Sequence, residues 1–259
     1  MIFYLSGTGN TKWAAEYISN VTHEQLINIT EVINGDCAFM LQEDERIGFC
    51  FPVHGWRPPL LVRKFIEKLN ISNPQGHYTF ALCTAGDTIG ETMDIFNNDI
   101  KKRNIHLDST FSLIMPESYV GLPFMDVDKP EKEKKKKTEA ERLIAGFAQH
   151  ISDRECGVNH LDIGRWPKIN SRIIGGYFTN RLITDKPFHV DKDKCIKCGK
   201  CESVCQVDNI TKAHDTFPEW KHNGNCMTCF ACYHHCPTHA IEFGRRTKKK
   251  GQYWYGKNK

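Results

Sequence analysis

At 259 residues the chain exceeds the length of one average domain, and its composition agrees with two globular domains. Its longest apolar run falls far short of the roughly 20 residues that a transmembrane helix needs, so no membrane span is expected. The 35 basic residues only slightly outnumber the 31 acidic ones, a balance that argues little for a nucleic-acid partner. Residues 1–5 lead straight into a glycine turn and leave no room for a signal peptide. We therefore expect a cytoplasmic protein whose cysteines are reduced.

The start of the chain predicts a short buried strand at residues 1–5 and a helix just after residue 11. The backbone N–H groups of the turn between them, together with the positive end of the helix dipole, attract an anion, and hydroxyl groups add donors. The turn lacks the G-x₄-G-K-[ST] pattern of the nucleotide P-loop, and Lys12 stands where the dinucleotide fingerprint has its third glycine. A single phosphate fits best, although the turn alone would also suit an ordinary glycine turn. Its residues are Ser6, Gly7, Thr8, Gly9, Asn10 and Thr11.

Downstream of this turn, strand and helix patterns alternate. Strands are predicted near residues 24–30, 46–52, 78–83 and 109–115, and helices near residues 58–69, 88–103 and 138–151. Such alternation indicates a doubly wound parallel sheet. Ser6–Thr11 resembles the FMN-phosphate loop of flavodoxins, and the alternating elements support that resemblance over residues 1–151. The resemblance implies an α/β, flavodoxin-like fold with a doubly wound, five-stranded parallel sheet in the order 2-1-3-4-5.

The same resemblance places the flavin beyond the carboxyl ends of the strands, where the strand order reverses. The loops after the third and fourth strands should hold the isoalloxazine ring there. Gly55 would let a backbone carbonyl or amide face N5 of the flavin, and Trp56 would stack on the ring or wall it. Alternatively, Trp56 plugs a domain interface, and His54, which titrates near neutral pH, is a solvated loop residue. The residues expected around the ring are Pro52, Val53, His54, Gly55, Trp56, Thr84, Ala85, Gly86 and Asp87.

Two further segments carry no motif. Lys129–Arg142 is a run of charges that leads into apolar residues at helical spacing, which indicates an amphipathic helix with a solvated face. Residues 152–187 include Trp166 and are too apolar for a free tether. We expect this connector to pack between two domains and to fix their separation.

The last quarter of the chain contains one cysteine spacing, C-x₂-C-x₂-C-x₃-C, twice. This spacing surrounds a [4Fe-4S] cube, because three thiolates on a tight loop reach three of its irons. The fourth cysteine is carried on a following helix and is better placed for the neighbouring cube, so the ligand sets are expected to cross over. One cluster would take Cys195, Cys198, Cys201 and Cys236, and the other Cys226, Cys229, Cys232 and Cys205.

Zinc and disulfides are the alternatives for these cysteines. Structural zinc uses separated pairs of ligands, whereas three cysteines at i, i+3 and i+6 overfill a tetrahedral site. Disulfides need an oxidising compartment, which a cytoplasmic location does not offer. Four more cysteines lie outside both motifs. Cys50 and Cys83 fall within predicted strands and are most simply core residues, while Cys37 and Cys156 receive no role.

Residues 186–245 resemble the two-cluster bacterial ferredoxins, and Pro237 with the residues after it follows the family pattern. The resemblance implies a small α+β domain that transfers electrons. Gln206 departs from the pattern, because it stands where the first motif usually has proline. The stretch between the motifs, residues 209–225, is also long and polar. These departures bear on the potential of the cube bound to Cys205 rather than on whether a cube forms.

The C-terminal tail, residues 246–259, is basic and contains no acidic residue, with Tyr253, Trp254 and Tyr255 among its basic residues. A tail of this kind docks an acidic redox partner, binds RNA or a membrane surface, lies disordered, or packs on its own domain. Disorder or docking on its own domain is the favoured expectation.

The whole chain resembles bacterial fusions of a flavodoxin-like domain with a two-cluster ferredoxin. The implied function is electron transport, in which two [4Fe-4S] clusters exchange single electrons with FMN and with redox partner proteins in low-potential, anaerobic metabolism. One alternative is an FMN-dependent reductase that takes a small organic substrate, and another is a redox or oxygen sensor. No NAD fingerprint is visible, so direct reduction by NADH is not expected. The implied division is 1–151 for the FMN domain, 152–185 for the connector, 186–245 for the ferredoxin domain and 246–259 for the tail.

Overall fold

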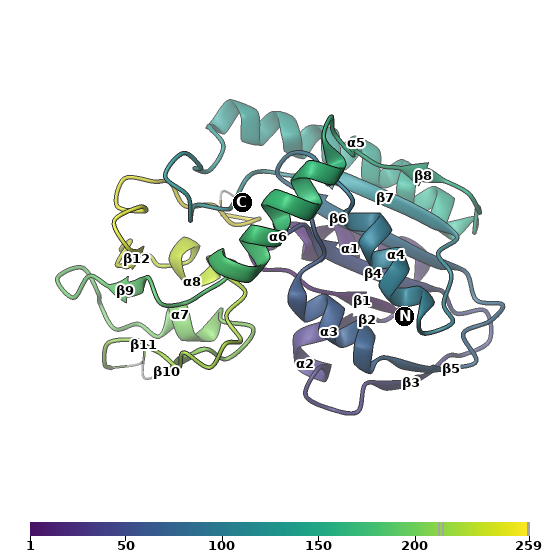
Figure 1. The fold of residues 1–259 in the computed structure, drawn as a ribbon, viewed down its shortest axis with the longest axis horizontal. Coiled ribbons are helices and arrows are strands. Elements are labelled where there is room, and N and C mark those ends of the chain that lie inside the picture. The colour runs from purple at the N-terminus through teal and green to yellow at the C-terminus, as the bar shows by residue number, and fades with distance from the viewer. Residues whose placement is uncertain (212, 214, 258–259) are drawn as a thin grey trace.

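The computed structural model describes residues 1–211, 213 and 215–257, and its largest element is a parallel β-sheet (Figure 1). Its strand order is β2-β1-β4-β6-β7-β8, and every neighbouring pair is parallel. Without β8 this is the expected order 2-1-3-4-5, so the doubly wound, flavodoxin-type sheet is confirmed. The sixth strand is only two residues long, too short to leave a pattern in the sequence. The strands are β1 (Ile2–Tyr4), β2 (Leu26–Asn28), β4 (Ile47–Pro52), β6 (Thr79–Ala85), β7 (Ser109–Ile114) and β8 (Asn159–His160).

Helices cover both faces of this sheet, because its central strands are apolar on both sides and must be buried on both. Phe49, Phe65 and Phe96 pack together on the face covered by α3 and α4. Phe80 and Phe111 pack on the opposite face, under α1 and α5. The helices are α1 (Asn10–Thr22), α2 (Ile29–Val32), α3 (Leu60–Lys68), α4 (Thr92–Lys101) and α5 (Pro130–Ser152).

Helix α5 begins at Pro130 rather than near residue 138, so most of the predicted charge run is helical. Proline suits the first turn of a helix, and ion pairs one turn apart, such as Glu133 with Lys137, support the charged turns. A small parallel pair of strands, β3 (Ala38–Met40) and β5 (Asn70–Ser72), lies outside the main sheet and was not predicted. Both strands are only three residues long, which is too short for a clear alternating pattern.

The C-terminal part is small and built from short elements. Two antiparallel strand pairs frame it, β9 with β12 and β10 with β11. Two helices of four residues each lie between them, and the rings of Phe188, Phe230 and Phe243 contact one another in its core. The elements are β9 (Phe188–Val190), α7 (Lys200–Ser203), β10 (Ile210–Thr211), β11 (Glu219–Trp220), α8 (Ala231–His234) and β12 (Ile241–Phe243).

Between the two parts runs a widely wound helix, residues 169–182, which we call the connecting helix. It passes through η1 (Ile169–Ile174), α6 (Gly175–Tyr177) and η2 (Phe178–Leu182). In Figure 1 this green helix lies between the sheet and the C-terminal elements, so the expectation that the segment packs between the two parts is confirmed. Its inner face is buried, whereas its outer face exposes several large apolar side chains. Among the described residues, no helix is long and apolar enough to cross a membrane.

Candidate functional site

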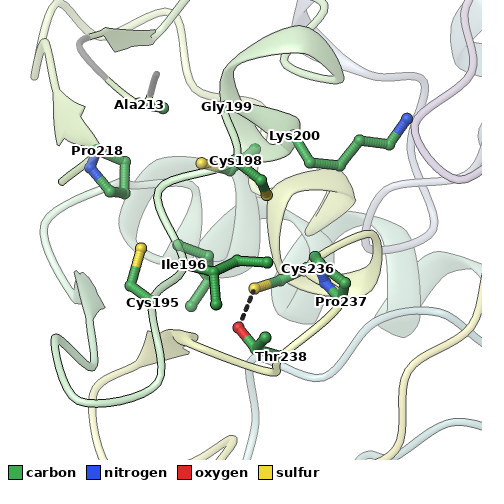
Figure 2. Close-up of a pocket in the computed structure, with 12 residues that line it drawn as sticks. Cys195, Ile196, Cys198, Gly199, Lys200, Ala213, Pro218, Cys236, Pro237 and Thr238 are labelled. Carbon is green, nitrogen blue, oxygen red and sulfur yellow. Dashed lines mark hydrogen bonds between the residues drawn. The ribbon is translucent and has the colours of Figure 1, made fainter. Parts of the chain in front are cut away.

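The eight motif cysteines lie in two groups of four around two cavities. The first cavity, drawn in Figure 2, is lined by Cys195, Cys198, Cys201 and Cys236, which we call the outer set. The second is lined by Cys205, Cys226, Cys229 and Cys232, which we call the inner set. Each set joins three cysteines of one motif to the fourth cysteine of the other. This is the grouping that crossed ligation of two [4Fe-4S] cubes requires.

Both motifs present their cysteines through the same backbone turns. The residue before the second cysteine has a positive φ in each motif, 56° at Lys197 and 51° at Thr228. The residue after it does too, 72° at Gly199 and 59° at Phe230, and a short helix starts there. Left-handed backbone favours glycine, so the strain at Phe230 must be offset by packing, here against Phe188. The turns direct three thiols of one motif toward one cavity.

Backbone amides donate hydrogen bonds to sulfur atoms of both sets. The Asn209 N–H donates to Cys205 Sγ at 3.3 Å, and the Ala240 N–H donates to Cys236 Sγ at 3.2 Å. Each donor lies four residues after the last cysteine of its motif, so the two sets are built alike. Burial raises the pKa of the Cys229 thiol to about 11, so the free thiol is protonated at neutral pH. Cluster assembly must displace such protons, and amide donors then stabilise the charge on sulfur.

The predicted phosphate loop, Ser6–Thr11, connects β1 to α1. The side chains of Ser6, Thr8 and Thr11 are all buried. Thr11 Oγ1 lies 2.7 Å from Thr84 Oγ1, which ties the loop to the end of β6. No acidic residue occurs in the first turn of α1, so the N–H groups there keep their attraction for an anion. The hydroxyl and amide donors present fit one phosphate group.

The two predicted ring loops lie at the same edge of the sheet, because β4 and β6 are neighbours. Pro52 is in register with Thr84, and the Val53 N–H donates to Thr84 O at 2.8 Å. Through the Thr11–Thr84 contact, this edge also adjoins the phosphate loop. The structure therefore brings together the ends of these strands and the loops after them, which contain Pro52, Val53, His54, Gly55, Trp56, Thr84, Ala85, Gly86 and Asp87.

The connecting helix packs directly on Gly55. A Cβ atom at Gly175 would lie 2.2 Å from Gly55 O, and a Cβ atom at Gly55 would lie 2.7 Å from the Phe178 ring. Gly55 also has a positive φ of 58°. Glycine is therefore required at both positions, by space and, at Gly55, by backbone conformation. The Gly55 carbonyl, one of the two backbone groups that the sequence offers to N5 of a flavin, lies against the helix.

Trp56 joins the ring loops to the connecting helix. Its carbonyl accepts a hydrogen bond from Ser171 Oγ at 2.8 Å, and its indole N–H donates to Thr88 Oγ1 at 3.2 Å. Ser171 Oγ also accepts a hydrogen bond from the Glu91 N–H at 2.7 Å. These hydrogen bonds join Trp56 to the connecting helix and to its own domain. Contact of its indole with a flavin ring stays a prediction.

Besides Arg57 and Asp87, three side chains at this edge titrate or carry charge. His54 is half-buried, and burial lowers its pKa to about 4, so the ring is neutral at neutral pH. Sequence reasoning missed the other two, which lie far away in the chain and carry no motif. Burial raises the pKa of Glu117, whose carboxylate lies against Gly86. Lys136 Nζ, on α5, donates to Gly86 O at 2.7 Å and so holds the second ring loop.

The C-terminal tail packs against the phosphate loop. The Tyr253 hydroxyl donates to Asn10 Oδ1 at 2.6 Å, and the Tyr255 N–H donates to Thr8 O at 2.8 Å. The Tyr255 ring stacks on Trp13 with 5.2 Å between centroids. Up to residue 257 the tail is therefore docked, but on the phosphate loop of the sheet domain as well as on His234 of its own domain, and residues 258–259 lie outside the described part. Three aromatic residues among the basic ones were the sequence signal for it.

The inner set adjoins the same loop. A Cβ atom at Gly7 would lie 2.7 Å from Cys229 Cβ. Met227 is buried in the apolar core under the sheet, and Val207 packs against that core. The loop expected to hold the flavin phosphate therefore contacts the region expected to hold one cluster. No local pattern in the sequence predicted this contact.

The remaining cysteines and Gln206 can also be placed. Cys50 and Cys83 are fully buried in the sheet, which confirms them as core residues. Cys37 is buried and Cys156 is exposed. Gln206 lines the inner cavity, and its Oε1 atom is buried without a hydrogen-bond partner among the described residues.

Comparisons with known proteins agree with this C-terminal geometry. Residues 188–237 match the family model of the 4Fe-4S dicluster domain. The chain is 39% identical over 62 residues to pyruvate synthase subunit PorD of Methanothermobacter marburgensis, a match that covers 24% of this chain and 69% of that protein. The fold and the cysteine sets therefore define an iron-sulfur protein of electron transport. The chain belongs to the family in which a flavodoxin-like domain is fused to a two-[4Fe-4S], bacterial-type ferredoxin.

Three solved structures are similar to 58%, 60% and 58% of this chain. They are rubredoxin:oxygen oxidoreductase from Desulfovibrio gigas (13% identity, TM-score 0.32), the metal-soaked Flv1 flavodiiron core from Synechocystis sp. PCC6803 (19%, 0.31) and a flavodoxin from the domain Archaea (20%, 0.32). The matched region spans 36% of each of the first two chains and 96% of the third. At these TM-scores the fold assignment rests on the strand order of the protein itself.

Proposed function

We propose that this protein relays single electrons between two [4Fe-4S] clusters and one FMN. The observation that carries the proposal is the contact between Gly7, in a loop suited to a phosphate, and Cys229 of the inner set. The rate of electron tunnelling falls steeply with distance, so two cofactors bound on either side of this contact exchange electrons fast. FMN holds one or two electrons and a cluster holds one, which makes the flavin the point where single electrons are paired.

In this proposal each cofactor has its own residues. The outer set binds one cluster and the inner set binds the other. The FMN phosphate binds to the N–H groups and hydroxyls of Ser6, Gly7, Thr8, Gly9, Asn10 and Thr11. The ring lies along the loops that contain Pro52, Val53, His54, Gly55, Trp56, Thr84, Ala85, Gly86 and Asp87.

The connecting helix favours a carrier over a reductase. A reductase needs open space over the flavin ring for its organic substrate. Phe178 packs on Gly55, and Ser171 holds Trp56, so this helix fills space beside the first ring loop. A flavin ring covered by this helix can still exchange electrons, because electrons tunnel through protein that a substrate cannot enter.

The setting of this relay is also a proposal. The relative PorD is a subunit of a pyruvate synthase. By analogy, we place this protein with redox partner proteins, in low-potential, anaerobic metabolism in the cytoplasm. Its working parts are residues 1–151 for FMN, 152–185 as connector, 186–245 for the clusters and 246–259 as the docked tail.

Anaerobic reconstitution with iron, sulfide and FMN tests the cofactor content. We expect about eight irons, eight sulfides and one FMN per chain. Thr8→Val removes a hydroxyl from the phosphate loop and should weaken FMN binding about tenfold or more, since a hydrogen bond to a charged group contributes roughly 1.5–3 kcal/mol. Thr138→Val, at an exposed position on α5, is the matched control and should leave FMN binding unchanged. Protein that holds both clusters but no FMN contradicts the proposal.

A further inference from the structure

We infer that the inner set holds the cluster that exchanges electrons with FMN, and that the outer set holds the cluster that a partner protein reaches. This order rests on the proposed function and deepens it, because it gives each cluster one role. A low-potential partner is oxidised by one electron as the outer cluster is reduced. That electron passes to the inner cluster and then to FMN. Two such electrons, with protons from water, complete the reduction of FMN.

The first support is the contact between the inner set and the phosphate loop. An ideal Cβ at Gly7 would lie 2.7 Å from Cys229 Cβ and 3.5 Å from Cys229 Sγ. Real Cβ atoms do not approach so closely, so only glycine lets the loop lie against this cysteine. A sulfur that binds the inner cluster therefore lies next to the backbone that would hold the FMN phosphate.

The second support is the anchoring of the inner set in the sheet domain. Met227, which follows the first cysteine of its motif, is 7% exposed and belongs to the apolar core that contains Phe3 and Phe49. Ile196 occupies the equivalent position in the other motif and is 62% exposed. The same position in two copies of one motif is thus a core residue on the inner side and a surface residue on the outer side.

The third support is the tail, which fixes the distance between the two parts. The Tyr253 N–H donates to His234 Nδ1 at 3.1 Å, and the Tyr253 hydroxyl donates to Asn10 Oδ1. His234 lies in α8, and its Nε2 donates to Ser118 O at 2.7 Å. One buried tyrosine therefore joins the phosphate loop to the helix that follows the inner-set loop. This arrangement holds the inner set against the loop.

The fourth support is the exposure of the outer set. Its cavity is lined by residues between Cys195 and Ile241, and the four cysteines of the inner set are all half-buried or buried. Cys198 is exposed, as is its neighbour Ile196. Figure 2 shows Cys198 and Cys195 on the loop that borders this cavity. The outer cluster is therefore the one within reach of a docked protein.

An iron chelator tests the exposure of the two clusters without reference to FMN. Holoprotein is mixed anaerobically with bathophenanthroline disulfonate, and iron release is followed by absorbance. We expect two phases, with half of the iron released at least fivefold faster than the rest. Cys198→Ala should abolish the fast phase, and Cys226→Ala should abolish the slow one. The reverse assignment overturns the proposed order.

Pulsed EPR tests which cluster lies next to the flavin. A reduced cluster nearby speeds the spin relaxation of one-electron-reduced FMN. We expect fast relaxation in the wild type and in Cys198→Ala, and at least fivefold slower relaxation in Cys226→Ala. Fast relaxation in Cys226→Ala together with slow relaxation in Cys198→Ala overturns the inference.

A glycine pair keeps the test valid if a cysteine variant does not fold. Gly7→Ala forces the loop and Cys229 apart, whereas Gly146→Ala adds a methyl group that meets no atom within 4 Å. We expect the spin relaxation of one-electron-reduced FMN to be slower in Gly7→Ala and unchanged in Gly146→Ala. The FMN and iron contents of both variants are measured as well. Unchanged relaxation in Gly7→Ala counts against the inference. Wild-type protein without FMN instead refutes the proposed function, and the chelator result still decides which cluster is exposed.

Discussion

The inner and outer cysteine sets share one spacing but lie in different surroundings. The inner set touches the phosphate loop through Gly7 and reaches the core of the sheet through Met227. The outer set exposes Cys198 and Ile196. Cysteine spacing thus determines which metal centre forms, whereas contacts between segments that are distant in the sequence determine which residues lie next to that centre.

Removal of the clusters should have the largest effect and should separate the two parts of the chain. Among its described residues, the C-terminal part has only two-stranded sheets and four-residue helices, which do not hold a domain together by themselves. We expect amides in residues 188–243 to lose hydrogen-exchange protection in the apoprotein. Amides in β1, β4 and β6 should keep theirs, because those strands are buried in a separate core. Equal loss of protection in both parts contradicts this division.

A matched pair of substitutions tests the asymmetry directly. Met227→Ala removes a buried side chain and should cost about 2–5 kcal/mol of unfolding free energy. Ile196→Ala, at the equivalent exposed position, should change it by no more than about 0.5 kcal/mol. Denaturant unfolding of the two holoproteins, compared with the wild type, gives both values. Similar losses for the two variants would show that the sets are equally anchored.

Tyr253→Phe isolates the hydrogen bond between the tail and the phosphate loop. It leaves the buried Asn10 Oδ1 without its tyrosine donor, so we expect a loss of about 1–3 kcal/mol in unfolding free energy. Trp254→Phe is the control, because that neighbouring ring stacks on His235, with 4.8 Å between the ring centroids. Equal stability of Tyr253→Phe and wild type, measured by thermal unfolding, would show that this hydrogen bond does not hold the tail on the phosphate loop.

The pH dependence of stability tests whether the first ring loop is buried. The pKa of His54 is about 4 in the folded protein and near 6.5 when unfolded. The unfolded chain therefore binds a proton that the folded one lacks as pH falls from 6.5 to 4, and stability falls over that range. His54→Gln should reduce this loss. Parallel pH curves for the two proteins would place His54 in solvent.

Much of this molecule followed from local pattern. The alternation of strands and helices predicted the parallel sheet, the resemblance to flavodoxins supplied its strand order, and the cysteine spacing predicted which four cysteines gather around each cavity. These predictions succeed because periodicity and spacing act within a few residues. The two-residue strand β8 was not predicted, because so short a segment shows no periodicity.

The contacts that matter most for the proposed relay were not predictable in this way. Gly7 and Cys229 are far apart in sequence, as are Tyr253 and Asn10, and nothing beside either residue specifies its partner. The position of the connecting helix on Gly55 is of the same kind. Glycine at 7, 55 and 175 can be explained once the structure shows what approaches each one, but not before.

An anaerobic redox titration of the reconstituted protein tests the relay most directly. Visible absorbance follows the flavin and EPR follows the clusters in one sample. We expect one-electron-reduced flavin to accumulate at potentials that overlap those of the clusters, as a carrier of single electrons requires. A flavin that passes directly to its two-electron form, well above the cluster potentials, would contradict the relay and favour a reductase.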